Sequence, residues 1–236
     1  MNPATIERWP ARRGASPTAV RAVVRRGGVV GRGAHETLRR RDLDLLAWLA
    51  EQYGARTDQL ERLLDCGPRT VQRVLARLRD AGLVTTRRLV VGDPAWAIPT
   101  GAGLRAAGHS LSVWQPRVGL LAHVAAVNDV RLHVQARSPE SEWIPERILA
   151  RERHAGEHLP DAVVLLDDQR VAIEVELTVK SQRRVTAILD QLTGRFDATL
   201  YFCAAGPQRQ LTALAHSGRW PTLGVRELPH ATRSRT

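Results

Sequence analysis

The chain has 236 residues, of which 35 are Lys or Arg and 24 are Asp or Glu, which gives a formal net charge of +11. A basic excess of this size indicates a polyanionic partner, and the length allows two domains. No apolar run approaches the roughly 20 residues of a membrane-spanning helix, and no signal-peptide core is expected at the N-terminus. The only cysteines, Cys66 and Cys203, belong to no metal-ligand cluster. We therefore expect a reduced, cytoplasmic protein without a membrane partner.

Residues 1–36 are rich in Arg, Gly and Pro and contain few acids. This composition predicts a basic, largely disordered arm. Such an arm could contact phosphates without sequence preference, which would raise affinity in a salt-dependent way, or it could be a solvated tail. Composition alone favours neither alternative.

Two helices are predicted next, ahead of a tight turn. An apolar stripe predicts the first helix, which begins at Leu38 and ends near Gly54. The segment TDQLERLLD predicts a second, short helix with Thr57 as its N-cap. Gly67 and Pro68 predict a turn, because glycine permits unusual dihedral angles and proline suits the first turn of a new helix.

The third predicted helix, RTVQRVLARLRDAG, buries one face and presents an arginine-rich face. Valines and leucines recur at helical spacing on the buried side. Arginine can bind guanine and glutamine can bind adenine in the major groove of DNA, while threonine and further arginines can hold phosphates. The candidate DNA-binding residues on this helix are Arg69, Thr70, Gln72, Arg73 and Arg77.

After Gly82 the pattern changes to two strands, LVTTRRLVV and AWAIP, joined by a turn, with a small helix in TGAGLRAAG. The hairpin would form a wing that brings Arg87 and Arg88 to the DNA backbone or minor groove. The ordered set of elements predicts a winged helix-turn-helix domain over residues 37–110. The alternative is that the arginines form an ordinary solvated surface.

The second half of the chain predicts an α/β domain over residues 117–230. Its elements are a helix over 117–137 with a core that includes Leu120 and Val124, a strand in EWIPERIL, two strands joined by a turn at 167–170, a helix over 181–192, a strand in DATLYFCA, a helix near 208–216 and a strand near Leu223. This order is α-β-β-β-α-β with an extension, so the whole chain is expected to be α+β or α/β.

Three carboxylates are predicted to share one face of the central hairpin. If its loop is centred on residues 168–169, Asp161 lies across from Glu176, and Glu174 projects from the same side. Carboxylates held this close repel one another unless a cation lies between them, so these three are candidate catalytic groups and ligands for Mg²⁺ or Mn²⁺. Lys180, the only lysine in the chain, is a candidate to reach a scissile phosphate.

The string PDAVVLLDDQRVAIEVELTVKS resembles the core of the PD-(D/E)xK nuclease superfamily, with Pro160 and Asp161 as the first motif and Glu174 opening the second. The resemblance implies a restriction-endonuclease-like sheet between helices and a metal-dependent site. Glu176 stands where lysine is usual, and Lys180 is a candidate substitute for it. The resemblance therefore supports metal binding more than catalysis.

A second resemblance covers nearly the whole chain after the arm. The segments TVQRVLARLRDAGLV, LAHVAAVNDVRLHV, PERILARER and EVELTVKSQRRVTAIL are similar to the replication-relaxation family of actinobacterial plasmids and integrated elements. That family implies DNA binding linked to plasmid replication or maintenance. It also adds Glu146 and Asp129 as candidate members of the acidic site.

Three functions stay open on the sequence. The first is a DNA-binding protein of a plasmid or mobile element, whose partner is double-stranded DNA. The second is an active endonuclease or nickase that uses Mg²⁺ or Mn²⁺, and the third is a transcriptional regulator whose degenerate nuclease fold serves homodimerisation. Against any acidic site stands the alternative that Glu174 and Glu176 face solvent and pair with arginines such as Arg147, Arg151 or Arg184.

Overall fold

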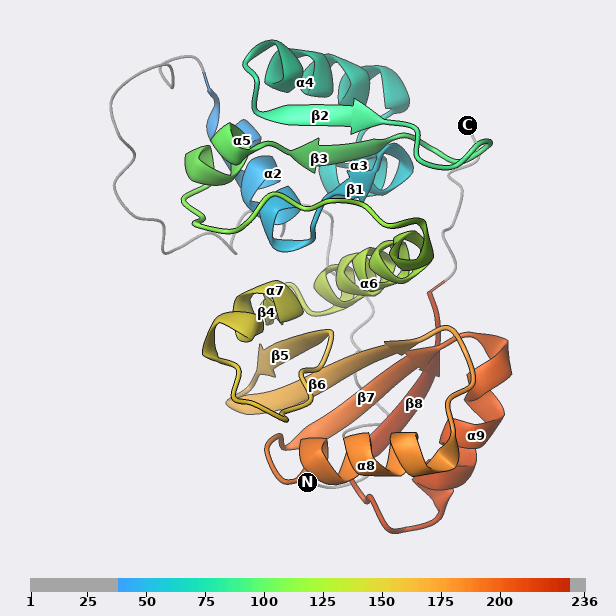
Figure 1. Cartoon of the computed structure of the whole chain (residues 1–236). Helices are drawn as coiled ribbons and strands as arrows, with labels where there is room; N and C mark the ends of the chain where they lie inside the picture. The colour runs from blue at the N-terminus through green and yellow to red at the C-terminus, as the bar shows by residue number, and fades with distance from the viewer. Residues whose placement is uncertain (1–37, 230–236) are drawn as a thin grey trace. The chain divides into compact units, whose positions relative to one another are not determined.

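The computed structural model describes residues 38–229, so the predicted basic arm lies outside the described residues. The chain divides into an N-terminal unit that extends to Asn128 and a C-terminal unit that begins at Asp129 (Figure 1). Each unit combines helices with a sheet, which confirms the mixed α and β class. Among the helices of residues 38–229, none is both long and apolar enough to cross a membrane.

The N-terminal unit begins with three helices, α2 (Arg40–Glu51), α3 (Thr57–Leu64) and α4 (Pro68–Asp80). Gly67 precedes α4 in an extended conformation, and Pro68 opens the helix, where its missing N–H leaves no hydrogen bond unmade. The expectation that Thr57 caps α3 is wrong by one residue. Arg56 is the N-cap, and its backbone N–H donates to Gln59 Oε1 at 3.2 Å.

A small antiparallel sheet and a short helix complete this part of the unit. The strands β1 (Ala55–Arg56), β2 (Val84–Arg87) and β3 (Trp96–Pro99) lie in the order β1-β3-β2, and α5 (Gly101–Ala106) follows. The Thr100 hydroxyl caps α5 by accepting from the Gly103 N–H at 3.1 Å. A Cβ at Gly103 would lie 2.0 Å from the Leu83 carbonyl oxygen, so α5 can approach β2 this closely only through a glycine.

Helix α6 (Val118–Arg137) spans the division between the units. Its first half packs onto the small sheet through an apolar cluster whose buried members are Trp96, Ile98, Leu121, Val124 and Ala125. Leu120, which the sequence places in the core, is 48% exposed, so that expectation is wrong. The helix turns Leu121 inward instead.

Buried amides also hold the first half of α6 in the N-terminal unit. Asn128 Nδ2 donates to the Gly54 carbonyl at 2.9 Å and to Gln59 Oε1 at 3.2 Å. Gln59 Nε2 in turn donates to the Ala125 carbonyl at 2.8 Å. These bonds satisfy polar groups that would otherwise be costly to bury.

The C-terminal unit contains the second half of α6 and a five-stranded sheet. Its further elements are β4 (Glu142–Pro145), α7 (Glu146–Leu149), the 3₁₀ turn η2 (Ala150–Glu152), β5 (Ala162–Leu166), β6 (Gln169–Glu176), α8 (Gln182–Thr193), β7 (Ala198–Cys203), α9 (Ala205–His216) and β8 (Leu223–Glu227). The predicted order of helices and strands is present. The predicted strand EWIPERIL is shorter than expected, because the chain coils into α7 after Pro145.

The sheet order follows the chain, β4-β5-β6-β7-β8, and its strands change direction at β6. The first three strands are antiparallel and the last three are parallel, with α8 and α9 as the crossovers (Figure 1). Both crossovers cover one face, where Val185 and Leu189 of α8 and Leu211 of α9 pack on Tyr201 of β7. On β7 the next residue, Phe202, meets the ring of His133 from α6 edge-on.

The register of the β5–β6 hairpin differs from the expected one by two residues. Ala162 pairs with Ile173, because the turn contains only Asp167 and Asp168. Both turn residues have positive φ, 48° and 61°, as tight two-residue hairpin turns require, and aspartate tolerates this conformation. A shift of two residues keeps each side chain on its predicted face but brings Asp161 level with Glu174 instead of Glu176.

Candidate functional site

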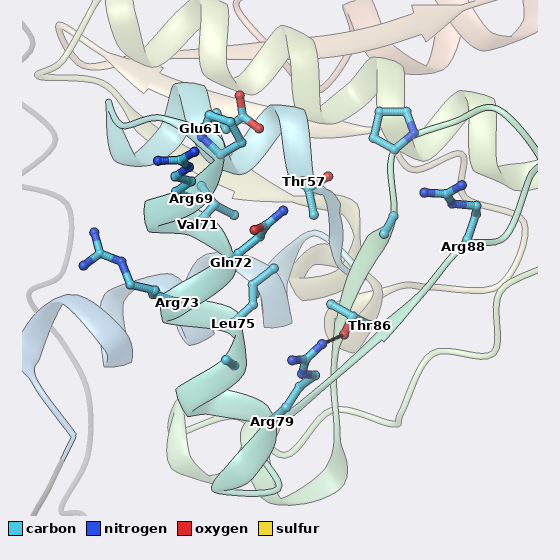
Figure 2. Close-up of a pocket in the computed structure, with 14 residues that line it drawn as sticks. Thr57, Glu61, Arg69, Val71, Gln72, Arg73, Leu75, Arg79, Thr86 and Arg88 are labelled. Atoms are coloured by element: carbon cyan, nitrogen blue, oxygen red, sulfur yellow. Dashed lines mark hydrogen bonds between the residues drawn. The ribbon is translucent and has the colours of Figure 1, made fainter.

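A groove of about 890 Å³ lies between α4 and the β2–β3 hairpin of the N-terminal unit (Figure 2). We call it the helix–hairpin groove. Its walls come from α3, α4 and both sides of the hairpin. The charged residues that line it are Arg69, Arg73, Arg79, Arg88 and Glu61. Four cations against one anion make the groove a favourable place for a polyanion.

The amphipathic pattern of α4 explains why the arginines face outward. Val71, Val74, Leu75 and Leu78 are buried at helical spacing, so the opposite face must carry the polar side chains. Gly67 and Pro68 start the helix directly after α3, which holds its N-terminal turn at the surface. The sequence therefore fixes which face of α4 is exposed.

The side chains of α4 point in different directions around the groove. Figure 2 shows Gln72 directed toward the hairpin side and Arg73 directed away from it. Arg79 Nη1 donates to the Thr86 hydroxyl at 2.9 Å and so links the end of α4 to β2. Arg88 lies beyond β2, on the opposite wall from α4 (Figure 2).

Not all the predicted DNA-binding residues line this groove. Arg77 lies outside it, and its Nη2 donates at 2.5 Å to Oδ1 of Asp42, a buried carboxylate of α2. Thr70 accepts a hydrogen bond from Arg73 at 3.2 Å, and Arg87 is exposed outside the groove. Arg77 is thus engaged in holding α4 against α2.

Arg79 is the arginine of the groove that the sequence pattern did not single out. It is exposed, and it follows Leu78, the last buried position of α4. Its spacing from Gln72, two helical turns, was the available signal, since residues seven apart lie on one helix face.

The second candidate site is the acidic cluster of the C-terminal unit, Asp161, Glu174 and Glu176. Glu174 and Glu176 are two residues apart on β6, so their side chains share one face of the sheet. Asp161 immediately precedes β5 and lies level with Glu174. Asp161 Oδ2 accepts from the Val175 backbone N–H at 2.7 Å. The structure therefore gathers the three predicted carboxylates at one end of the hairpin.

Each glutamate of the cluster has a basic partner. His158 Nε2 lies 2.8 Å from Glu174 Oε1, and Lys180 Nζ lies 2.5 Å from Glu176 Oε2. Both glutamates are buried, at 4% and 5% exposed. The alternative that they face solvent and pair with surface arginines is therefore wrong. Lys180 is one of the candidate site residues named from the sequence, and His158, from the loop before β5, joins it in the structure.

Burial dominates the electrostatics of Glu174. It raises the pKa of this carboxyl to about 7, because removal from water penalises the charged form more than the hydrogen bond from His158 favours it. The charge of Asp161 raises the pKa further. Burial together with the three carboxylates also raises the pKa of Tyr201, whose buried hydroxyl has no hydrogen-bond partner among the described residues.

The arrangement of the acidic cluster does not match a divalent-ion site. Within residues 38–229, no group of three or more His, Cys, Asp and Glu side chains is placed to hold a metal ion. One oxygen of each carboxylate, Asp161 Oδ2, Glu174 Oε1 and Glu176 Oε2, faces the Val175 N–H, His158 and Lys180 in turn. The residues present do not fit the ion in this arrangement.

The two further acids suggested by the resemblance, Glu146 and Asp129, lie on α7 and α6. The Glu146 backbone N–H donates to the Asp161 carbonyl at 2.9 Å, which places the start of α7 beside the cluster, but the Glu146 side chain is exposed. Asp129 lies on α6 at the start of the C-terminal unit and is half-buried.

The replication-relaxation family model matches residues 46–192. The match begins in α2 and ends in α8, so it includes the helix–hairpin groove and the acidic cluster. Comparisons with curated proteins and with solved structures find no match.

Proposed function

Because the chain belongs to the replication-relaxation family, we propose that it is a double-stranded DNA-binding protein that acts in the replication or maintenance of a plasmid or mobile element. The N-terminal unit would be a winged helix-turn-helix in which α4 is the recognition helix and the β2–β3 hairpin is the wing. The observation that carries the proposal is the arginine-lined groove between these two elements.

The charge of the groove supports a polyanion over other ligands. Its arginines are Arg69, Arg73, Arg79 and Arg88, while Glu61 is its only acid among the lining residues. Arginine side chains hold phosphate oxygens through paired N–H donors and also bind guanine edges. A small uncharged metabolite would leave these guanidinium groups without a counter-charge.

The proposal assigns different parts of the DNA to different parts of the groove. A recognition helix enters the major groove with its N-terminal residues on the base edges, which gives Arg69 and Gln72 the role of base contacts. The concavity between helix and wing then receives the sugar–phosphate backbone that separates the major from the minor groove. Arg79 and Arg88, on its two walls, would hold that backbone.

The first test is binding of the full chain to a labelled duplex of about two helical turns, roughly 20 base pairs, measured by fluorescence anisotropy over a salt series. We expect log K to fall linearly with log salt with a slope of about −2 to −4, since each neutralised phosphate contributes about 0.9 and between two and four groove arginines would contact phosphates. Binding should be unchanged by EDTA. Salt-independent binding, or none at 50 mM salt, would reject the proposal.

Gln72 provides a test of base recognition. Gln72→Ala removes an amide that can pair with adenine, so we expect the preferred site to lose about 1 to 3 kcal/mol of discrimination at one base pair, with an unchanged salt slope. The measurement is selection of preferred duplexes from a random library by both proteins. Gln182→Ala, which changes an exposed glutamine at the start of α8, is the matched control, since it should leave the selected sequence as it is.

An active endonuclease is the rival function. It needs a divalent ion at the acidic cluster, whose oxygens are turned to protein donors. Conversion of supercoiled plasmid to the nicked form with Mn²⁺, lost in Asp161→Ala, would establish the nuclease. We expect the plasmid to stay supercoiled.

A further inference from the structure

We infer that His158 and Lys180 stabilise the acidic cluster in the place of a divalent metal ion, so that the C-terminal unit folds without metal. This inference concerns the C-terminal unit and is independent of whether the groove binds DNA.

The cluster needs compensation because of where it lies. Glu174 and Glu176 are buried on β6, and Asp161 lies level with Glu174. Buried carboxylates without partners destabilise the folded state, and three of them near one another add mutual repulsion. A fold that keeps all three must supply donors or a cation.

Lys180 supplies the first positive charge. It comes four residues after Glu176, where the chain leaves β6, and its Nζ lies 2.5 Å from Glu176 Oε2. The other oxygen, Oε1, accepts from the Thr178 backbone N–H at 3.3 Å. Both oxygens of Glu176 are therefore occupied by groups from the same turn of chain. Gln210 Nε2 donates to the Lys180 carbonyl at 3.0 Å, which fixes this turn against α9.

His158 supplies the second donor, and its position is also fixed. The His158 backbone N–H donates to Gln191 Oε1 of α8 at 2.8 Å, and its carbonyl accepts from Arg195 Nη1 at 2.9 Å. With the backbone held on both sides, the imidazole Nε2 lies 2.8 Å from Glu174 Oε1. The loop that carries His158 is thus attached to the helix that covers this face of the sheet.

The third carboxylate accepts a hydrogen bond from the backbone. Asp161 Oδ2 accepts from the Val175 N–H at 2.7 Å, which is a backbone group of β6 between the two glutamates. The three carboxylates therefore have three separate partners instead of one shared partner. A divalent ion that used Glu174 Oε1 or Glu176 Oε2 would have to displace His158 or Lys180 from that oxygen.

The test is a calorimetric titration of Mn²⁺ into the metal-free full chain, together with thermal unfolding in EDTA and in Mn²⁺. We expect no saturable binding up to about 1 mM, the weak end of protein divalent-ion sites, and the same unfolding midpoint in both solutions. Saturable binding that raises the midpoint and disappears in Asp161→Asn would overturn the inference.

The double variant His158→Ala/Lys180→Ala removes both internal partners. It should unfold at a lower temperature than the wild type in EDTA and should recover part of the loss in Mn²⁺, because the three carboxylates are then free to share an ion. The matched control is His154→Ala, a change to an exposed histidine of the same loop. If the double variant does not fold, Lys180→Gln takes its place. An unfolding midpoint equal to that of the wild type in either variant would contradict the assigned role.

Discussion

Replacing Arg69 and Arg73 together with alanine is expected to weaken duplex binding about 100-fold, because each removed arginine contact contributes roughly 1 to 3 kcal/mol. The salt slope should also become less steep, by about one unit for each of these two arginines that contacts a phosphate. Both side chains are exposed on α4, so their removal should not disturb its buried face. Anisotropy of a labelled duplex at several salt concentrations measures both effects, and the thermal unfolding midpoint checks the fold.

The matched control is Arg183→Ala/Arg184→Ala, which removes the same charge from the exposed first turn of α8. This variant should lose less than about 3-fold in affinity, since neither arginine lines the helix–hairpin groove and solvated surface charges are screened within about 10 Å at 0.1 M salt. Equal losses in the two double variants would mean that net charge, and not the helix–hairpin groove, governs binding.

The elements of both units could be predicted from the sequence because each has a local signal. The buried stripe of α4 follows the helical period, and the strands β5 and β6 are apolar runs on either side of a two-residue turn. Errors occurred where the local signal was ambiguous. Leu120 and Leu121 are neighbours with equal hydrophobicity, so only packing against Trp96 and Ile98 decides which of them is buried.

The faces of the acidic cluster could be predicted, but its partners could not. Strand alternation places Glu174 and Glu176 on one side of the sheet whatever the register. The cluster was therefore predicted correctly although the predicted register was wrong by two residues. His158 is 16 residues from Glu174 in the chain, and its approach depends on hydrogen bonds to Gln191 and Arg195 of a later helix and loop. No pattern near His158 carries that information.

The same limit applies to the N-terminal unit. Arg77 and Arg73 are both exposed-face arginines of α4 in sequence, but only Arg77 reaches Asp42 of α2. Which arginine holds the fold and which remains available to a ligand depends on the packing of α2 against α4. The composition of the helix predicts a basic surface, but the contacts of α4 with α2 determine which of its arginines remain available on that surface.

The pKa of Glu174 makes the stability of the C-terminal unit depend on pH. Burial raises this pKa from an ordinary value of 4.5 to about 7, so the folded chain binds a proton more tightly than the unfolded chain. The stabilising effect of that proton is complete below pH 4.5 and is lost as pH rises through about 7. The loss is on the order of 3 kcal/mol, since each pKa unit corresponds to about 1.4 kcal/mol.

Glu174→Gln should abolish this loss, because the amide keeps the shape and can still accept from His158 but cannot ionise. We expect the free energy of unfolding of the variant, relative to the wild type, to increase by about 3 kcal/mol between pH 4 and pH 8. Urea unfolding across this range measures it, and Glu140→Gln, a change to an exposed carboxylate, corrects for the lost charge. His158 is present in both proteins, so the difference reports on Glu174 and its coupling to that imidazole. If this difference in unfolding free energy stays flat or falls as pH rises, the Glu174 carboxyl is charged in the folded protein at neutral pH. The interaction with His158 would then lower the pKa of Glu174 more than burial raises it.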